Sequence, residues 1–432
     1  MIKGNKKIIN AWTFYDWANS VYPLVITTAI FPMFYEAVTS ETNAEGKTIN
    51  DMVLFFGYSF KNTELYSYVA SLSFLTVSII SPILSGIADY ADNKKRFLQF
   101  FCYLGAISCA CLYFFDTAHL EWSMLPVFLA SVGFWGSLVF YNAYLPEIAD
   151  PVMHDQISAK GYSLGYIGSS ILLIINLVMI MVFDIHPKYA FLTVAAWWVV
   201  FSQYTFRRLP NRVYLKEERE NDWMKGWKEL KKVWGQLSDQ KTLKRYLLAF
   251  FIYSMGVQTV MLMATLFGAK EINWADDGAK TGLIVSVLII QFIAIAGAYF
   301  FSWLSKKRGN LQALAISIFI WILICITAYF IHEPVEFYAL AGIVGLVMGG
   351  IQSLSRSTYS KILPETTDHA SFFSFYDVLE KLGIVIGTFA YGLIEGLTGS
   401  MRNSVLVLIV FFVVGFFVLL WVPKNNNLEA QV

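Results

Sequence analysis

The chain has 432 residues, of which 57% are hydrophobic and only 15% are charged, and its formal net charge is +1. Soluble globular proteins carry roughly 25% charged residues, so this composition excludes a soluble protein and predicts a polytopic membrane protein. The balanced charge, without a basic face, argues against nucleic acid as a partner. The five histidines lie between the apolar stretches without the spacing of metal ligands, so we expect no metal and no cofactor.

Twelve apolar stretches follow one another along the chain. Each is long enough to cross a bilayer as a helix, which takes about 20 residues. They lie near residues 11–38, 65–88, 97–115, 123–145, 161–183, 189–206, 246–269, 281–304, 311–331, 337–360, 372–395 and 403–422. The predicted fold is therefore all-α, with twelve transmembrane helices.

The loops between these stretches predict their orientation. Most of the loop lysines and arginines fall in alternate loops, and the opposite set of loops, which includes the polar stretch 39–64, holds few of them. Because basic loops stay in the cytoplasm, both termini are expected there. An even number of helices is required for that arrangement, and twelve satisfies it.

The first apolar stretch carries a polar stripe. A carboxylate inside a membrane is costly, so it usually has a partner or a function. Helical spacing puts four polar residues of this stretch on one face, with Asn19 beside them: Thr13, Asp16, Ser20 and Thr27. We interpret this face as one wall of a cavity.

A second polar stripe with the same spacing lies in the eleventh predicted helix. Its members are Ser374, Asp377, Lys381 and Thr388, with Glu380 beside them. The tenth predicted helix adds Gln352 and Arg356, one turn apart. Counting from the helix ends places five charges at similar depth, in the cytoplasmic third of one cavity: Asp16, Arg356, Asp377, Glu380 and Lys381.

The sum of these five charges leaves one negative charge without a partner. A carboxylate without a counter-charge in a medium of low dielectric tends to hold a proton. We therefore predict proton coupling through Asp16, Asp377, Glu380 and Lys381. The alternative is a salt-bridge network that locks the two halves together and binds nothing, and the two interpretations are compatible.

Substrate contacts are expected along the same walls. Arg356 suits a substrate carboxylate, and Asp16 or Asp377 suits its ammonium group. Gln258 is included because its helix, the seventh, is the counterpart of the first. The predicted substrate-binding residues are Asp16, Asn19, Tyr141, Asn142, Gln258, Gln352, Arg356, Tyr376 and Asp377.

An internal repeat divides the chain. The pattern Tyr-x-x-x-Leu-Pro-Glu occurs at 141–147 and again at 359–365, about half the chain apart, and a basic turn after the second helix recurs after the eighth. Two six-helix halves in parallel repeat are the architecture of major facilitator transporters. We predict an N-terminal half at 1–206, a cytoplasmic linker at 207–245 and a C-terminal half at 246–432.

The linker itself contains a predicted amphipathic helix. Its apolar residues recur with helical spacing and have lysines between them: Trp223, Trp227, Leu230, Trp234 and Leu237. Such a stripe predicts a helix lying on the inner membrane surface. The alternative is a helix that packs on another cytoplasmic loop.

The turn after the second helix resembles the loop motif of major facilitators. Its glycine, carboxylate and basic cluster are Gly86, Asp89, Lys94, Lys95 and Arg96. Ser85 and Tyr90 depart from the usual pattern, which has a glycine and a basic residue there. By this resemblance the turn is a gating loop in which Asp89 contacts the N-terminal end of a helix in the other half, where the helix dipole favours an anion.

Four stretches resemble the vacuole-effluxer-like branch of the major facilitator superfamily. They are residues 15–20, 141–147, 349–357 and 372–378, from helices 1, 4, 10 and 11. The branch contains fungal autophagy-related proteins that export amino acids from the vacuole, and many bacterial members. The resemblance implies a transporter, and Glu380 stands where a small residue is common in the branch.

The predicted protein is not an enzyme. We expect a secondary transporter of a bacterial inner membrane, acting as a monomer, that moves a small polar solute by alternating access with protons as a coupling partner. Amino acids are the first candidates for the solute. Sugars, nucleosides or short peptides are the alternative, and a lipid flippase or a sensor that does not transport is a further one.

Overall fold

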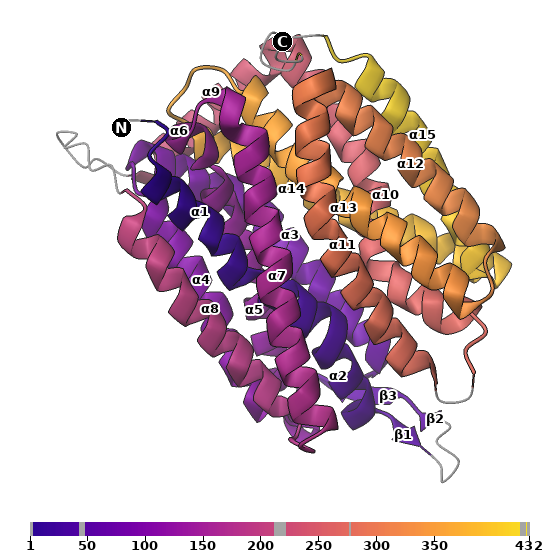
Figure 1. The fold of residues 1–432 in the computed structure, drawn as a ribbon. Coiled ribbons are helices and arrows are strands. Elements are labelled where there is room, and N and C mark those ends of the chain that lie inside the picture. Colours follow the sequence, from indigo (N-terminus) through magenta and orange to yellow (C-terminus); the bar gives the residue numbers. More distant parts are fainter. Residues whose placement is uncertain (1–2, 43–47, 211–221, 276–277, 424–428, 430–432) are drawn as a thin grey trace.

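The computed structural model describes residues 3–42, 48–210, 222–275, 278–423 and 429. Long helices make up the bulk of the molecule, and both termini lie at one end of the helix bundle (Figure 1). Helices of the first part of the chain are α1 (Lys6–Asn19), α2 (Phe31–Thr39), α3 (Asn62–Tyr90), α4 (Lys94–Cys111), α5 (Leu120–Asn142), α6 (Leu145–Ile148), α7 (His154–Met181) and α8 (Lys188–Arg208). Those of the second part are α9 (Asp222–Asp239), α10 (Lys241–Glu271), α11 (Gly278–Arg308), α12 (Asn310–Phe330), α13 (Pro334–Ile362), α14 (His369–Thr398) and α15 (Met401–Leu420).

Ten helical segments in the described part of the chain are long and apolar enough to cross a membrane. Two further long helices, α8 and α14, lie where the sixth and eleventh spans are predicted. Helix α14 carries Asp377, Glu380 and Lys381, and α8 ends in Arg207 and Arg208, which lowers their mean hydropathy. The protein is thus an all-α, multi-pass membrane protein.

The long helices pack as two groups. In the first group α1 packs against α7 and α8, and α4 packs against α5 and α8. In the second group α10 packs against α14 and α15, and α11 packs against α13. Helix α7 packs against α11 and α13, and α3 packs against α14, so these helices join the groups (Figure 1).

The first span is continuous but changes its winding. After α1 ends, residues Tyr22–Ile30 form a π-helix, and α2 follows directly. Pro23 has no N–H to donate, and its carbonyl accepts hydrogen bonds from the hydroxyls of Thr27 (2.7 Å) and Thr28 (2.8 Å). Because a π-helix has more residues per turn, the predicted polar stripe does not continue with regular spacing from Ser20 to Thr27.

The stretch 39–64, expected to be a polar external loop, contains short strands. Strands β1 (Glu41–Thr42) and β2 (Thr48–Asn50) pair antiparallel, as do β3 (Met52–Phe55) and β4 (Tyr58–Lys61). The β3–β4 turn has positive φ at Phe56 and Gly57, the conformation that matches the twist of a two-residue hairpin. These strands lie at the end of the bundle opposite the termini (Figure 1).

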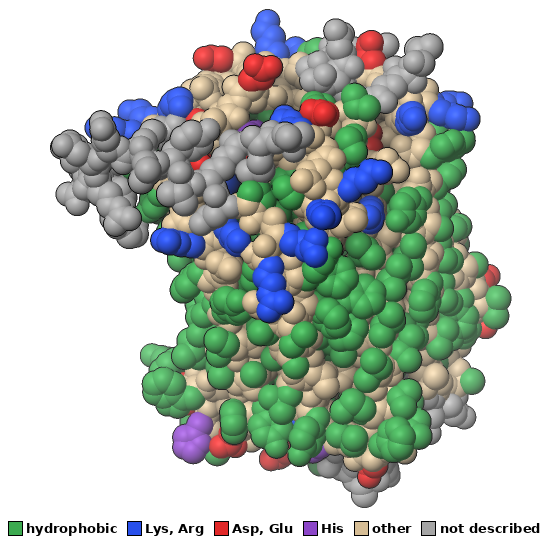
Figure 2. All heavy atoms as spheres, turned by 60° about the vertical axis from the view of Figure 1, so that its left-hand side comes forward, with side chains coloured by type: hydrophobic (Ala, Val, Ile, Leu, Met, Phe, Trp, Pro, Cys, Tyr) green, Lys and Arg blue, Asp and Glu red, His purple; other side chains and the backbone are tan. Residues whose placement is uncertain are grey.

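The two ends of the molecule differ in charge. Lysines and arginines gather at the end that carries the termini, above a surface dominated by hydrophobic side chains (Figure 2). The basic turns 94–96 and 306–308 contribute to this end, which we call the basic end. The apolar surface below it is what a bilayer requires of a multi-pass protein.

The predicted linker helix forms, as α9, and it packs on protein. It lies against α3 and α14, with Val233 buried and the ring of Trp234 5.5 Å from that of Phe375. Trp234 is nevertheless 61% exposed. The side chains of Trp223, Trp227 and Leu230 lie outside the described residues, so a position on the membrane surface stays a prediction.

Candidate functional site

An ion pair between Asp16 and Arg356 joins the two helix groups. Asp16 lies on α1 and Arg356 on α13, and the carboxylate oxygen Oδ2 lies 3.2 Å from Nη2 of the guanidinium. The same oxygen accepts a hydrogen bond of 2.7 Å from the hydroxyl of Tyr141 on α5. Both charged side chains are almost fully buried. A buried charge is strongly destabilising unless it is paired, so each of these two groups needs the other.

The guanidinium of Arg356 also makes hydrogen bonds on the sides that do not face Asp16. Its Nε donates to the hydroxyl of Ser158 at 2.9 Å, Nη2 donates to the carbonyl of Ser158 at 3.0 Å, and Nη1 donates to Asn142 at 3.4 Å. The guanidinium carbon also lies 4.2 Å from the ring centre of Tyr162 and 4.8 Å from that of Trp12, within the range of cation–π attraction. We call these residues, with Asp16 and Tyr141, the Asp16 cluster.

Close approach of α7 makes this cluster possible. Gly161 faces the pair, and a Cβ at that position would meet Oδ2 of Asp16 and lie 3.0 Å from Nη2 of Arg356. Gly165 and Gly168, further along α7, face Ser20 and Trp17 of α1 in the same way. Small residues at helical spacing let two membrane helices approach closely, which explains the tight packing of α1 on α7.

A second buried charge cluster lies on α14. Lys381 forms ion pairs with Asp377 and with Glu380, the latter at 3.2 Å. Glu380 also accepts a hydrogen bond of 2.8 Å from the amide of Gln258 on α10. The ammonium of Lys381 lies 4.0 Å from the ring centre of Trp135 on α5. We call these five residues the Lys381 cluster.

The predicted single cluster of five charges is therefore divided in two. Among the described residues, no ion pair connects the Asp16 cluster to the Lys381 cluster. The first has one carboxylate and one guanidinium, so its charges balance. The second has two carboxylates and one ammonium, and Oδ2 of Asp377 is buried without a hydrogen-bond partner in the described part of the chain.

Three other predicted substrate residues contact neither the charged atoms of Arg356 nor those of Lys381. Asn19 is buried next to Ser20, and its amide nitrogen has no partner among the described residues. Gln352 accepts a hydrogen bond of 2.5 Å from Tyr166 of α7. Tyr376 stacks on Phe250 with ring centres 4.0 Å apart, so its ring is part of an aromatic contact.

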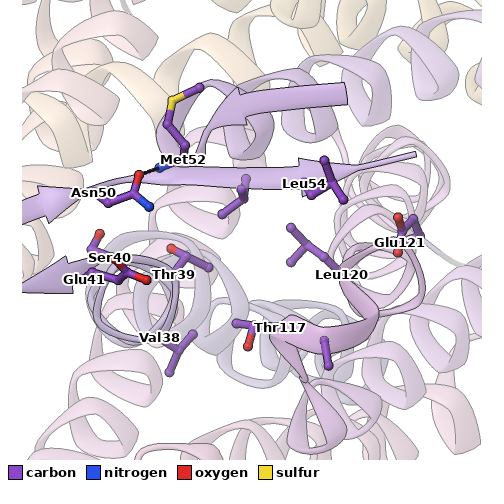
Figure 3. A pocket seen from close by; sticks show the side chains of 12 residues that line it. Val38, Thr39, Ser40, Glu41, Asn50, Met52, Leu54, Thr117, Leu120 and Glu121 are labelled. Carbon is purple, nitrogen blue, oxygen red and sulfur yellow. Dashed lines mark hydrogen bonds between the residues drawn. The ribbon is translucent and has the colours of Figure 1, made fainter. Parts of the chain in front are cut away.

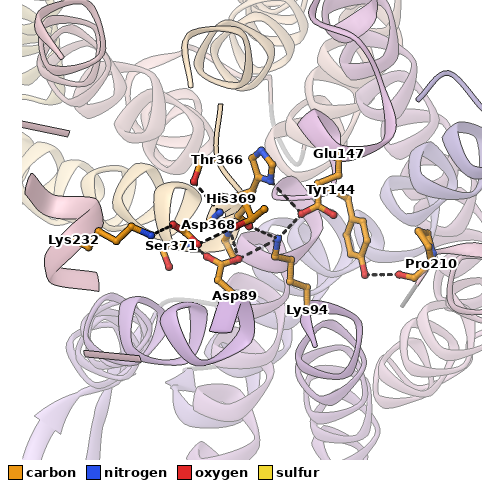
Figure 4. Close-up of polar contacts among 12 residues, drawn as sticks. Asp89, Lys94, Tyr144, Glu147, Pro210, Lys232, Thr366, Asp368, His369 and Ser371 are labelled. Carbon is orange, nitrogen blue, oxygen red and sulfur yellow. Dashed lines mark hydrogen bonds and ion pairs between the residues drawn. The ribbon is translucent and has the colours of Figure 1, made fainter. Parts of the chain in front are cut away.

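The turn after α3 meets the beginning of α14 at the basic end (Figure 4). Asp89 accepts hydrogen bonds from the backbone N–H groups of Ala370 (3.2 Å) and Ser371 (2.7 Å). This confirms the expected contact of Asp89 with a helix N-terminus, where N–H groups and the dipole favour an anion. The contact joins the two helix groups, and its role in gating stays a prediction.

Lys94 extends this network. Its ammonium pairs with Asp89 at 3.1 Å and with Glu147, and Glu147 also contacts His369 of α14 at 3.2 Å. Lys95 instead donates to the carbonyl of Leu209, which follows α8 in its own helix group. Among the other predicted gating residues, Gly86 is buried within α3 and Arg96 is exposed.

A second network at the basic end was not foreseen from the sequence. Asp155, near the start of α7, accepts hydrogen bonds from Ser305 (2.8 Å) and Asn310 (2.7 Å), and pairs with Lys361 at 2.7 Å. Its three partners come from α11, α12 and α13, so this carboxylate also joins the two helix groups. Two polar networks, centred on Asp89 and on Asp155, thus join the two helix groups at the basic end.

The residues that shape the two clusters were not predicted from the sequence. Ser158, Gly161 and Tyr162 lie on one stretch of α7, and Trp135 lies on α5. The glycine spacing 161–165–168 was a usable signal for close helix contact. Trp135 had no distinguishing signal, because aromatic residues make up 17% of the chain.

At the opposite end a pocket of about 440 Å³ lies between the strands, the end of α2 and the start of α5 (Figure 3). Glu121 accepts a hydrogen bond of 3.0 Å from the N–H of Phe56, which attaches the β3–β4 hairpin to α5. Asn62, the first residue of α3, donates to Thr39 and Ser40 at the end of α2 at 2.9 Å. The pocket is built from different residues than the two charged clusters.

Comparison with known proteins agrees with this architecture. The family model described as "Vacuole effluxer Atg22 like" matches residues 4–432. The chain belongs to this family. It is 31% identical to the MFS-type transporter YxiO of Bacillus subtilis, over all of this chain and 98% of the relative. It is 26% identical to autophagy-related protein 22 of Kluyveromyces lactis, over 99% of this chain and 94% of that protein.

Solved structures give the fold of this member of the Atg22-like family. It resembles FucP, a major facilitator superfamily transporter solved in the outward conformation, with a TM-score of 0.69 and 13% identity over 98% of this chain and 99% of FucP. It also resembles a bacterial homologue of the iron transporter ferroportin, with a TM-score of 0.67 and 11% identity over 98% of this chain and all of that one. The protein therefore has the major facilitator fold. The family match and the similarity to the MFS-type transporter YxiO further show that it is a membrane transporter of the major facilitator superfamily.

Proposed function

We propose that this Atg22-like family member is a proton-coupled secondary transporter of amino acids or similar small zwitterions. Coupling resides in the Lys381 cluster, where two carboxylates face one ammonium. The observation that carries the proposal is the buried Oδ2 of Asp377, which has no hydrogen-bond partner among the described residues. A buried carboxylate with incomplete pairing is a place where a proton can be held and released.

The Asp16 cluster acts as an inner lock in this proposal. Its charges balance and its hydrogen bonds are made across the two helix groups, so it favours the state in which the basic end is closed. Opening that end requires breaking this ion pair together with the contacts of Asp89 and Asp155. Alternating access then consists of making and breaking these sets of contacts while the solute is bound between the groups.

Zwitterions suit the charged groups that would become available during this cycle. When the lock opens, Arg356 loses Asp16 and can bind a carboxylate in bidentate geometry. The ammonium group of the solute competes with Lys381 for Asp377 and Glu380, because two carboxylates face a single lysine there. The matching family is described as vacuole effluxers, which favours export. We therefore propose that amino acids are exported from the cytoplasm, the compartment on the side of the basic end.

We also propose that both termini lie in the cytoplasm, an orientation that is supported by the lysines and arginines gathered at the basic end. The halves comprise residues 1–206 and 246–432, with 207–245 as the linker between them, and the protein acts as a monomer in a bacterial inner membrane. Asn19, Tyr141, Asn142, Gln258, Gln352 and Tyr376 complete the proposed solute site.

Transport by purified protein in liposomes tests the proposal. A metabolite library of amino acids, sugars, nucleosides and short peptides is first screened by thermal stabilisation, and the stabilising compounds are then assayed for uptake with and without a pH gradient. Amino acids are expected among the compounds that stabilise and are transported. Stabilisation and transport only by sugars or nucleosides would replace the proposed solute class.

The variant Asp377→Asn tests the coupling step. We expect it to abolish acceleration of transport by a pH gradient and also to weaken solute-induced stabilisation, because Asp377 is a proposed contact of the solute ammonium group. Glu395→Gln is the matched control, because it removes a carboxylate from the far end of the same helix, where it pairs with Lys270. If Asp377→Asn, Glu380→Gln and Asp16→Asn each kept the wild-type response to the gradient, coupling through these residues would be wrong.

A further inference from the structure

A groove on the surface of the first helix group lies apart from both charged clusters. It has a volume of about 440 Å³ and opens between α1, α7 and α8. Its lining residues are Asn10, Thr13, Phe14, Lys160, Leu164, Phe201 and Tyr204. Val200 and Tyr204 of α8 are exposed large side chains, so this surface is one that the bilayer covers.

The three helices that form the groove share one pattern. On α1, Lys6 precedes Asn10 by one turn, and Phe14 follows by another. On α7, Lys160 precedes Leu164 by one turn, and on α8 Arg208 follows Tyr204 by one turn. Each helix therefore presents a cation toward the basic end and an apolar or aromatic side chain deeper in the membrane, by about 6 Å on α7 and α8 and about 12 Å on α1.

The walls of the groove are built of packed aromatic rings. Phe14 has its ring centre 5.1 Å from that of Tyr204 and 5.9 Å from that of Phe201. Edge-to-face contacts of this kind hold the rings in place without filling the groove. The apolar part of the groove is thus a preformed surface.

The cations at its mouth are held in position without an acidic partner. The ammonium of Lys160 donates to the amide oxygen of Asn10 at 2.6 Å, and the guanidinium carbon of Arg208 lies 4.8 Å from the ring centre of Tyr204. Within the described part of the chain, neither side chain forms an ion pair with a carboxylate. Their positive charge is therefore available to an anion at the membrane surface.

We propose that this groove binds an anionic phospholipid from the membrane leaflet at the basic end. The headgroup phosphate contacts Lys160 and Arg208, with Lys6 nearby on α1, and an acyl chain lies along Phe14, Leu164 and Phe201. Basic residues near an anionic leaflet strengthen such binding electrostatically, and the apolar contact adds to it. A bound lipid would bridge α1 and α7, the helices that carry Asp16 and Ser158, both of which bind Arg356.

Lipid binding to the purified full-length protein tests this site. The protein is titrated with phosphatidylglycerol or phosphatidylethanolamine in detergent, and bound lipid is measured by native mass spectrometry. Wild-type protein is expected to bind the anionic lipid more tightly. The double variant Lys160→Gln/Arg208→Gln should bind it about thirtyfold more weakly, the result of losing two such charges.

Two further variants separate the groove from general effects. Lys241→Gln/Lys244→Gln removes two exposed cations from α10 at the same end, and it should bind the lipid like wild type. Leu164→Trp fills the apolar part without changing charge, and it should also weaken binding. Melting in lipid-free detergent confirms that each variant is folded.

Three results would overturn the proposal. One is unchanged phosphatidylglycerol binding by the folded Lys160→Gln/Arg208→Gln variant, and another is equal affinity of wild type for the zwitterionic lipid. The third is a photoreactive phosphatidylglycerol that labels peptides other than those containing Asn10, Leu164 or Tyr204. Labelling of these peptides, lost in Leu164→Trp, supports the site.

Discussion

The Asp16 cluster and the Lys381 cluster are both buried and charged, but they are assembled differently. Asp16 and Arg356 are 340 residues apart in the chain, and their contacts come from four helices, α1, α5, α7 and α13. The three charges of the Lys381 cluster lie within a single turn or so of α14. Long-range pairing thus characterises the first cluster, and local pairing characterises the second.

The clusters also differ in how completely their polar atoms are bound. The guanidinium of Arg356 donates to a carboxylate, a hydroxyl, a carbonyl and an amide, whereas Oδ2 of Asp377 has no partner among the described residues. A fully paired buried network makes a structure rigid, and an incompletely paired one is ready to take up a proton or a ligand. The Asp16 cluster is therefore suited to locking the two helix groups together, and the Lys381 cluster is suited to binding and releasing a proton or a ligand.

The largest expected effect is that of Arg356→Met. Within the described part of the chain it leaves the buried carboxylate of Asp16 with Tyr141 as its one side-chain hydrogen-bond donor, and losing one member of a buried pair costs about 3–5 kcal/mol. The free energy of unfolding, measured by SDS titration of the purified protein, should fall by that amount. The double variant Asp16→Asn/Arg356→Met should recover part of the loss, and equal losses in both variants would contradict a paired lock.

Gly161→Ala tests the same lock through packing. The added methyl group meets Asp16 and Arg356, and α7 cannot move away freely because the carbonyl of Ser158 binds the guanidinium. Overpacking of this kind costs about 1–3 kcal/mol in unfolding free energy. Gly392→Ala on α14 is the control, since a Cβ there meets nothing within 4 Å. Equal unfolding curves for the two variants would show that α7 is not held against the pair.

Trp135→Leu perturbs the Lys381 cluster from the other helix group. It removes the ring over the Lys381 ammonium but leaves both ion pairs of that ammonium, so the expected loss is about 0.5–2 kcal/mol. The same SDS titration measures it. A loss as large as that of Arg356→Met would mean that the two clusters do not differ as their hydrogen bonding indicates.

Lys270→Gln shows how little unfolding free energy is lost when an exposed ion pair is removed, for comparison with both buried clusters. Lys270 pairs with Glu395 at 2.9 Å at the far end of α14, and its side chain is 62% exposed. Exposed pairs contribute about 0–1 kcal/mol, because water solvates both partners. An unfolding curve close to that of wild type is expected. A loss comparable to that of Gly161→Ala would show that burial does not explain the ranking of these variants.

Much of the fold could be predicted from the sequence. Long apolar stretches predicted spanning helices at the places where α3, α4, α5 and α7 lie, and the all-α major facilitator fold is confirmed. The π-helix after α1 and the strands between α2 and α3 were not predicted. The winding of the helix around Pro23 and the pairing of short strands depend on neighbouring segments, which hydropathy does not describe.

The polar residues of the candidate site could be named from the sequence, but their partners could not. A carboxylate or a guanidinium within an apolar helix is conspicuous by itself, because desolvation makes it costly wherever the helix packs. Asp16, Arg356, Asp377, Glu380 and Lys381 were found on that ground. Ser158 and Trp135 were missed, since a serine or an aromatic residue in a membrane helix is common.

What the sequence determined by itself was thus the class of protein, the approximate place of its long helices, and the residues whose burial needs a partner. Hydropathy and helical spacing are local properties, so they can be read along one chain. Only the tertiary structure decided that Arg356 forms an ion pair with Asp16, and that Lys381 forms ion pairs with Asp377 and Glu380. Pairing depends on which helices lie side by side and on how closely glycines such as Gly161 let them approach, and these distances arise only when the helices pack.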